Sequence, residues 1–162
     1  MTASTDPATK EPFERVVQAH GDVVWKVCRG LLPQHDAEDA WSETFLAAMR
    51  AWDRFDGDRV RGWLVTIAHR KALDVLRAGA RVETREDGPP DRAVEPPGRD
   101  LDLWAALARL PAAQRAAVVH HHLAGLPHAD VAALTGSTPA AVRKAASDGV
   151  RRLRALMTEE PR

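Results

Sequence analysis

The sequence has a single cysteine, no tyrosine and no excess of positive or negative charge. One cysteine, Cys28, cannot form a disulfide within the chain, which is typical of a protein from a reducing compartment. A net charge of zero means that no overall electrostatic field attracts nucleic acid. Any surface for nucleic acid therefore has to be local.

Long apolar runs are also missing. No stretch approaches the ~20 apolar residues that a membrane-spanning helix needs, and the N-terminus has no apolar core of signal-peptide length. The sequence contains no Gly-rich phosphate loop, nucleophile motif or metal-ligand spacing. We therefore expect a cytoplasmic protein without membrane insertion, catalytic residues, metal, cofactor or small-molecule substrate.

What the sequence does have is apolar residues at helical spacing, in a chain whose hydrophobic content of 44% supports a globular core. The spacing predicts a helix over Phe13–Arg29, with Gly30 as its stop. A second helix is predicted to begin with Asp36 as N-cap, and a third to follow an acidic loop and end near Arg77. These helices predict a small bundle over residues 13–78, preceded by a disordered N-terminus, residues 1–12.

A change of composition divides the chain in two. Residues 79–99 mix Gly and Pro with charges of both signs and have almost no large apolar side chains, which predicts a flexible linker. A second all-α domain is predicted over residues 100–157. Within it, a helix over residues 128–134, a turn at Gly136 and a longer helix from Thr138 have helix-turn-helix spacing.

The exposed faces of the predicted helices differ in character. Asp39, Glu43 and Arg50 share one face of the second helix with Leu46, an apolar residue expected to be exposed. An exposed apolar residue among charges favours a docking surface, although a simply solvated face has the same pattern.

The third helix carries a basic stripe. Arg59, Thr66, Arg70 and Arg77 lie on one face beside Trp63. Cations beside an aromatic ring suit single-stranded nucleic acid, because cations follow phosphates and a ring can stack on an unpaired base. A solvated basic face, with Trp63 in the core, is the alternative.

The last predicted helix is cationic on its outer side, a pattern that suits the major groove of DNA but also an ordinary solvated helix. Val142, Ala146, Gly149 and Met157 belong to its predicted inward row. A preceding triplet, residues 120–122, consists of histidines that point about 100° apart on a helix, so they cannot bind one metal ion together. We expect them at the surface or partly packed.

Two stretches resemble a known family. Residues 36–57 read DAEDAWSETFLAAMRAWDRFDG and residues 61–77 read RGWLVTIAHRKALDVLR, which closely resembles the second conserved region of bacterial RNA polymerase sigma factors of the extracytoplasmic-function group. Residues 110–115, LPAAQR, and 123–143, LAGLPHADVAALTGSTPAAVR, resemble the fourth conserved region. Arg70 stands where that family commonly has Asn, and Lys144 and Ala145 where it usually has Ser and Arg.

The resemblance implies three sets of site residues. It implies that core polymerase binds a docking face formed by Asp36, Asp39, Glu43, Leu46 and Arg50. It implies that melted bases of the promoter −10 element bind a second set, Asp56, Gly57, Asp58, Arg59, Trp63, Thr66, Arg70 and Arg77. It implies that the −35 element binds a third set, Ser137, Thr138, Pro139, Arg143, Lys144, Ser147 and Arg151.

The function that the resemblance implies is a non-enzymatic specificity subunit. Its expected partners are core RNA polymerase, promoter DNA and, as is common in the group, an anti-sigma factor, and the holoenzyme would lie at the nucleoid. A helix-turn-helix regulator that binds operators as a dimer remains an alternative, although the N-terminal half lacks the strand and helix alternation of a receiver domain. A third alternative is a catalytically inert protein that binds polymerase without starting transcription at a promoter.

Overall fold

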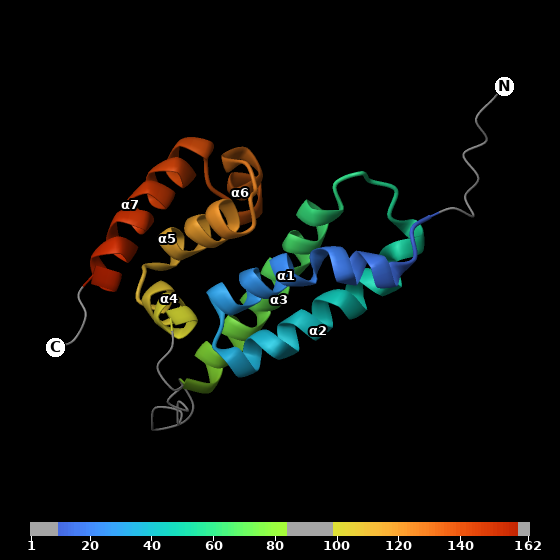
Figure 1. Ribbon diagram of the computed structural model, residues 1–162, viewed down its shortest axis with the longest axis horizontal. Helices are drawn as coiled ribbons and strands as arrows, with labels where there is room; N and C mark the ends of the chain where they lie inside the picture. Colours follow the sequence, from blue (N-terminus) through green and yellow to red (C-terminus); the bar gives the residue numbers. More distant parts are fainter. Residues whose placement is uncertain (1–9, 84–98, 159–162) are drawn as a thin grey trace.

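The computed structural model describes residues 10–83 and 99–158, and every regular element in these ranges is a helix. Figure 1 shows an N-terminal part of three helices beside a C-terminal part built from the remaining ones. The predicted all-α fold with two helical parts is thus confirmed. Most of the predicted disordered N-terminus (residues 1–9) and of the predicted linker (residues 84–98) lies outside the described residues.

The N-terminal part is a three-helix bundle. Its helices are α1 (Phe13–Leu31), α2 (Gln34–Ala51) and α3 (Val60–Glu83), with the 3-10 turn η2 (Trp52–Arg54) after α2. Each of the three long helices packs against the other two. Their inner faces bury an apolar core, which includes Val16, Val24, Val27, Ala40, Phe45, Leu64 and Val65.

Cys28 belongs to this core. Its side chain is fully buried on α1, and burial raises the pKa of the thiol to about 12. The thiolate, which is the reactive form, is therefore scarce at neutral pH.

Proline opens several of these helices. Pro33 occupies the N-cap position of α2, and Pro12 does the same for α1. In the C-terminal part, Pro111 and Pro127 occupy the N-cap positions of α5 (Ala112–Ala117) and α6 (His128–Thr135), and none of the four helices has a side-chain cap hydrogen bond. Proline suits a helix start because it fixes φ and has no N–H to leave unpaired. The prediction of Asp36 as N-cap is therefore wrong, since α2 begins at Gln34 and Asp36 lies in its first turn. There its carboxylate still interacts favourably with the positive end of the helix dipole.

Two predicted helix ends also differ from the structure. Helix α1 continues through Gly30 to Leu31, because Gly30 is buried against another helix rather than left at a free end. Helix α3 continues past Arg77 to Glu83, where alanines and charged residues of good helix propensity extend it.

The C-terminal part begins with α4 (Arg99–Ala108) and α5 (Ala112–Ala117), which continues directly into the π-helical turn η3 (Val118–Leu123). The helices α6 (His128–Thr135) and α7 (Pro139–Thr158) follow, and Gly136 between them has a φ of 70°, which favours glycine. This is the predicted helix-turn-helix. The last buried residue of α7 is Gly149. Met157, predicted to point inward, is 45% exposed, because the end of α7 extends past the buried positions.

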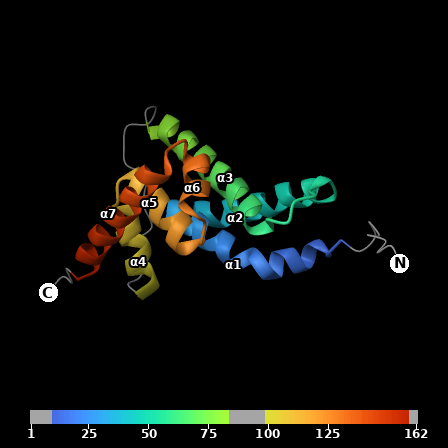
Figure 2. The same ribbon diagram turned by 90° about the horizontal axis from the view of Figure 1, so that it is seen from above.

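The two parts pack against each other. Helix α1 contacts η3, α4 and α5, and Figure 2 shows the C-terminal part lying across one end of the bundle. Buried residues of both parts form one continuous core. The sequence predicts two modules with adjustable spacing, and it does not predict this shared core.

None of the helices in the described ranges is long and apolar enough to cross a membrane.

Candidate docking face and nucleic-acid interface

The candidate docking face lies on the outer side of α2. Asp39, Glu43, Leu46 and Arg50 are all exposed there, while Phe45 and Ala48 on the opposite side are buried in the core. Leu46 is 47% exposed, as the sequence predicts for this residue.

A second apolar side chain on α2 enlarges this face. Met49 is 51% exposed and lies three residues after Leu46, so the two are neighbours on the helix surface. The sequence analysis missed Met49, although its spacing from Leu46 is a signal for it. Asp36 is half-buried at the start of the helix. Two apolar residues and several charges together form a surface that favours protein contact over full solvation.

The loop between η2 and α3 is supported by stacked aromatic rings. Phe55 stacks on Trp63 with 4.1 Å between ring centroids, and Trp52 lies beside both. Gly57 packs on the Phe55 ring, where a Cβ atom would lie only 3.0 Å from Phe55 Cζ. The Lys10 ammonium donates to the carbonyls of Trp52 and Phe55.

These contacts decide which groups near the loop reach solvent. Asp56, Gly57, Asp58 and Arg59 are exposed, whereas Trp63 is half-buried and one face of its ring is covered by Phe55. Trp63 therefore positions the loop and offers less free ring surface than the sequence predicts.

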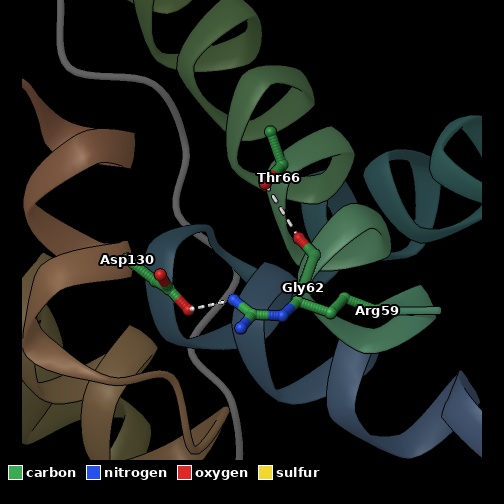
Figure 3. Close-up of polar contacts among 4 residues, drawn as sticks. All are labelled: Arg59, Gly62, Thr66 and Asp130. Carbon is green, nitrogen blue, oxygen red and sulfur yellow. Dashed lines mark hydrogen bonds and ion pairs between the residues drawn. The ribbon is translucent and has the colours of Figure 1, made fainter. Parts of the chain in front are cut away.

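The basic stripe of α3 is exposed at its charged positions. Arg59, Arg70 and Arg77 lie at the surface and Thr66 is half-buried. The Thr66 hydroxyl donates a hydrogen bond of 2.8 Å to the Gly62 carbonyl, so its proton is used within the helix. Arg59 forms an ion pair of 3.8 Å with Asp130 of α6, and Figure 3 shows the guanidinium reaching across to that helix. The predicted nucleic-acid stripe thus begins with a residue that contacts the C-terminal part.

The start of α7 has the geometry of a capped recognition helix. The Thr138 hydroxyl accepts a hydrogen bond of 3.1 Å from the Ala141 N–H, so Thr138 is the N-cap of α7. The other candidates for DNA contact in this part are also exposed, namely Ser137, Pro139, Arg143, Lys144, Ser147 and Arg151.

The inner side of α7 fixes the orientation of this helix. Val142, Ala146 and Gly149 are buried, and a Cβ atom on Gly149 would lie 2.7 Å from Val118 Cγ2. Asp148 forms an ion pair of 3.9 Å with Arg151 on the same helix, which partly offsets the local positive charge. The exposed cations around Arg143 still present a basic helix behind a capped turn.

His120 is the clearest difference from the sequence prediction. It was expected at the surface or partly packed, but it is 0% exposed, and its Nε2 atom lies 2.9 Å from Nδ1 of His69, which is 6% exposed. Burial lowers the pKa of His120 to about 3, and the charge of His69 adds to this effect. Burial, together with the charge of Arg70, also lowers the pKa of His69.

Two further histidines lie near the turn before α6. The rings of His121 and His128 stack with 3.9 Å between centroids, and His121 Nδ1 lies 2.7 Å from the Leu126 carbonyl oxygen. In residues 10–83 and 99–158, no group of three or more His, Cys, Asp or Glu side chains is placed to hold a metal ion.

Comparison with protein families matches both helical parts. Residues 16–82 match the model of Sigma-70 region 2, and residues 100–153 match that of Sigma-70, region 4. The region 2 match thus covers the N-terminal bundle, and the region 4 match covers the helix-turn-helix part.

Curated proteins with similar sequences are RNA polymerase sigma factors. The ECF sigma factor SigE of Mycolicibacterium smegmatis is 30% identical over 94% of this chain, which spans 64% of SigE. CarQ of Myxococcus xanthus is 35% identical over 76% of this chain, which spans 75% of CarQ. NccH of Alcaligenes xylosoxydans xylosoxydans is 29% identical over 90% of this chain, which spans 86% of NccH.

Solved structures agree in fold. The sigma factor RpoE from Bartonella quintana, in complex with the anti-sigma factor NepR, aligns with a TM-score of 0.75 at 24% identity over 92% of this chain and 98% of that one. CnrH, in complex with the cytosolic domain of CnrY, aligns with a TM-score of 0.66 at 27% identity over 92% of this chain and 89% of that one.

Proposed function

Because this chain belongs to the sigma-70 family of RNA polymerase sigma factors, in its extracytoplasmic-function group, we propose that it binds core RNA polymerase and directs transcription initiation at promoters with −10 and −35 elements. Sigma factors are specificity subunits and not enzymes, so no residue is assigned a catalytic role. The observation that supports this function best is the match of both helical parts, in the order of the family, on a fold that exposes the matched surfaces.

We assign the docking face for core polymerase to α2. Asp36, Asp39, Glu43 and Arg50 would provide charged contacts, and Leu46 would provide the apolar anchor that protein interfaces place near their centre. Met49 adds to that anchor through its exposure beside Leu46. A helix that is fixed by buried Phe45 and Ala48 can present these side chains without first becoming ordered.

We assign the −10 element to the loop and stripe of α3. The exposed residues Asp56, Gly57 and Asp58 form a loop that the aromatic stack holds in place. Arg59, Arg70 and Arg77 would contact phosphates of the melted strand, with Thr66 beside them. Trp63 would hold the loop in place, and the part of its ring that Phe55 leaves uncovered would contact the melted strand.

We assign the −35 element to the helix-turn-helix. Recognition helices place their N-terminal residues at base edges and later residues at phosphates. Ser137, Thr138 and Pro139 open α7, and Arg143, Lys144 and Ser147 follow on its exposed side. Arg151 lies further along and would contact the backbone.

The proposed setting is the cytoplasm, with the chain at the nucleoid when it is part of holoenzyme. We also propose the anti-sigma partner that the sequence resemblance implies. In support, the similar protein CnrH is solved with a protein partner, the cytosolic domain of CnrY. The alternative of a dimeric operator-binding regulator is disfavoured, because residues 16–82 match region 2 rather than a receiver domain.

Reconstituted transcription tests this function directly. The purified chain is added to bacterial core RNA polymerase with a library of promoter fragments, and transcript start sites are sequenced. We expect starts that share two upstream elements at a fixed spacing and that disappear when the chain is omitted. Binding to core without any promoter-specific start would instead support a protein that only occupies polymerase.

Replacing Arg143 by alanine is expected to weaken −35 recognition by about 1–3 kcal/mol, or roughly 5–150-fold, if its guanidinium binds a base edge in bidentate fashion. The measurement is holoenzyme affinity for a cognate promoter and for the same promoter with a scrambled −35 element. Arg152→Ala is the matched control, since Arg152 is an exposed arginine about 180° away on α7. Equal losses on both promoters would mark Arg143 as a phosphate contact.

A further inference from the structure

The chain just before α1 contacts the turn that leads into the proposed −10 loop. Trp52 Nε1 donates a hydrogen bond of 3.1 Å to the carbonyl of Glu11, which lies 41 residues earlier in the chain. Figure 1 shows this start of the described chain beside the end of α2. Lys10 and Glu11 both precede residues 16–82, the range that matches Sigma-70 region 2. A segment outside the matched region thus contacts the turn next to the proposed −10 surface.

The Lys10 side chain holds both ends of this turn. Its ammonium donates hydrogen bonds to the carbonyls of Trp52 and Phe55, which are the first residue of η2 and its C-cap. The same nitrogen lies 4.5 Å from the centroid of the Trp52 ring and 5.9 Å from that of the Phe55 ring. Carbonyls at a helix end carry partial negative charge and aromatic faces attract cations, so both kinds of contact favour the charged ammonium.

These contacts fix the first peptide of the loop. The Phe55 carbonyl belongs to the peptide bond that joins Phe55 to Asp56, where the exposed loop begins. The Phe55 ring stacks on Trp63 with 4.1 Å between centroids, and the Cβ position of Gly57 lies 3.0 Å from Phe55 Cζ. Both the ring and the carbonyl of Phe55 are therefore held, and the path of the loop follows from them.

The start of α1 is anchored independently of Lys10. The Phe13 ring lies 5.8 Å from the Trp52 ring and 6.3 Å from the Phe45 ring, measured between centroids. Lys10 itself is exposed and lies ahead of the first residue of the helix. Loss of its ammonium would therefore release the turn and the loop without opening the core of the bundle.

We propose that Lys10 is a positioning residue for −10 recognition, because its ammonium holds η2 and the first peptide of the loop in the geometry that captures melted bases. Lys10 acts through Phe55 and the loop and does not contact the promoter. A loop that is ordered before binding loses less conformational entropy when the strand arrives. The proposal deepens the proposed function and rests on its assignment of Asp56, Gly57 and Asp58 to the −10 element.

Amide hydrogen exchange in the free chain tests the contact without polymerase. The Phe55 N–H donates to the Ala51 and Trp52 carbonyls at 3.0 and 3.1 Å, so its exchange reports whether the turn stays formed. Lys10→Met removes the charge and the donors but keeps an unbranched side chain, and it should speed exchange at Phe55 about 10-fold. Exchange at Val24, in the core, should not change. Equal Phe55 rates in the wild type and Lys10→Met would overturn the proposal.

Holoenzyme binding tests the consequence for recognition. The probes are a single-stranded oligonucleotide with the −10 element found by start-site sequencing and the same oligonucleotide with that element scrambled. Lys10→Met should weaken binding to the cognate strand about 10-fold and leave binding to the scrambled strand unchanged. Lys10→Arg should restore cognate binding, because a guanidinium has donors for two carbonyls and also stacks on aromatic rings. Lys26→Met is the matched control, since Lys26 is an exposed lysine of α1 outside the assigned surfaces.

Two binding results would contradict the positioning role. Equal affinities of the wild type and Lys10→Met for the cognate strand would show that the loop does not need Lys10. An equal loss on both strands, with a weaker dependence on salt, would show that Lys10 contacts a phosphate directly. A failure of the proposed function would appear separately, as an absence of promoter-specific starts with the wild-type chain, while exchange at Phe55 would still respond to Lys10→Met.

Discussion

The double substitution Glu43→Arg with Leu46→Ala is expected to lower the affinity of the chain for core RNA polymerase about 100-fold, which corresponds to roughly 2.7 kcal/mol. Leu46 is exposed on a rigid helix, so its removal takes away the apolar anchor without opening a cavity in the bundle. The arginine reverses the charge beside that anchor, and a like charge at an interface is strongly unfavourable.

A matched control separates this effect from a general loss of folding or stability. Glu14→Arg with Leu76→Ala makes the same two chemical changes at exposed positions of α1 and α3, outside the assigned surfaces. Assembly is measured by fluorescence anisotropy of the labelled chain titrated with core polymerase. Unchanged assembly of the Glu43 and Leu46 variant would show that the docking face has been placed on the wrong side of α2.

Acidification is expected to separate the two helical parts, and this expected effect is the second largest. The chain is called closed when the two parts are packed together, as in the structure, and open when they are apart. The His120 pKa in the closed chain is about 3, and an exposed histidine has a pKa of about 6.5, so the open chain binds more protons between these values. The stability of the closed form is therefore fully present above pH ~6.5 and is lost as the pH falls towards 3. Between pH 6.5 and 4.5 the ratio of closed to open chain should fall about 50-fold.

The charge beside the histidine pair acts in the same direction. After burial, the Arg70 guanidinium on α3 is the second cause that lowers the pKa of His69, so a proton on that imidazole would lie near a fixed positive charge.

The radius of gyration measured from pH 7.5 to 4.5 checks this expectation, with circular dichroism to show that the helices persist. The variant His69→Leu with His120→Leu replaces both partners by apolar residues of similar size, which can be nearly neutral for stability. It should stay closed across the same pH range. A wild-type chain that stays closed down to pH 4.5 would show that protonation of the histidine pair does not separate the two parts.

The sequence predicts the helices well because each depends on local patterns. The apolar spacing of α1 and the glycine of the helix-turn-helix turn are both local features, and the structure confirms each. The exposure of Leu46 follows from its place opposite Phe45 and Ala48 on α2.

Contacts between distant residues could not be predicted in the same way. His69 and His120 are 51 residues apart, and no local rule indicates that they meet. Gly30 shows the same difficulty, because a glycine at a helix end and a glycine that allows close packing look alike in sequence. For His120 a local signal did exist, since it lies four residues after Ala116 and three before Leu123, the spacing of residues that share one face of a helix.

The buried thiol of Cys28 has a practical consequence for measuring this conformational change. With a pKa of about 12, on the order of one thiol in 100,000 is ionised at neutral pH, so maleimide and nitroxide reagents will leave it unmodified. Cysteines introduced at two surface positions, one in each helical part, can therefore carry paired spectroscopic labels without first removing the native residue. The wild-type core then remains intact while the distance between the labels reports whether the chain is open.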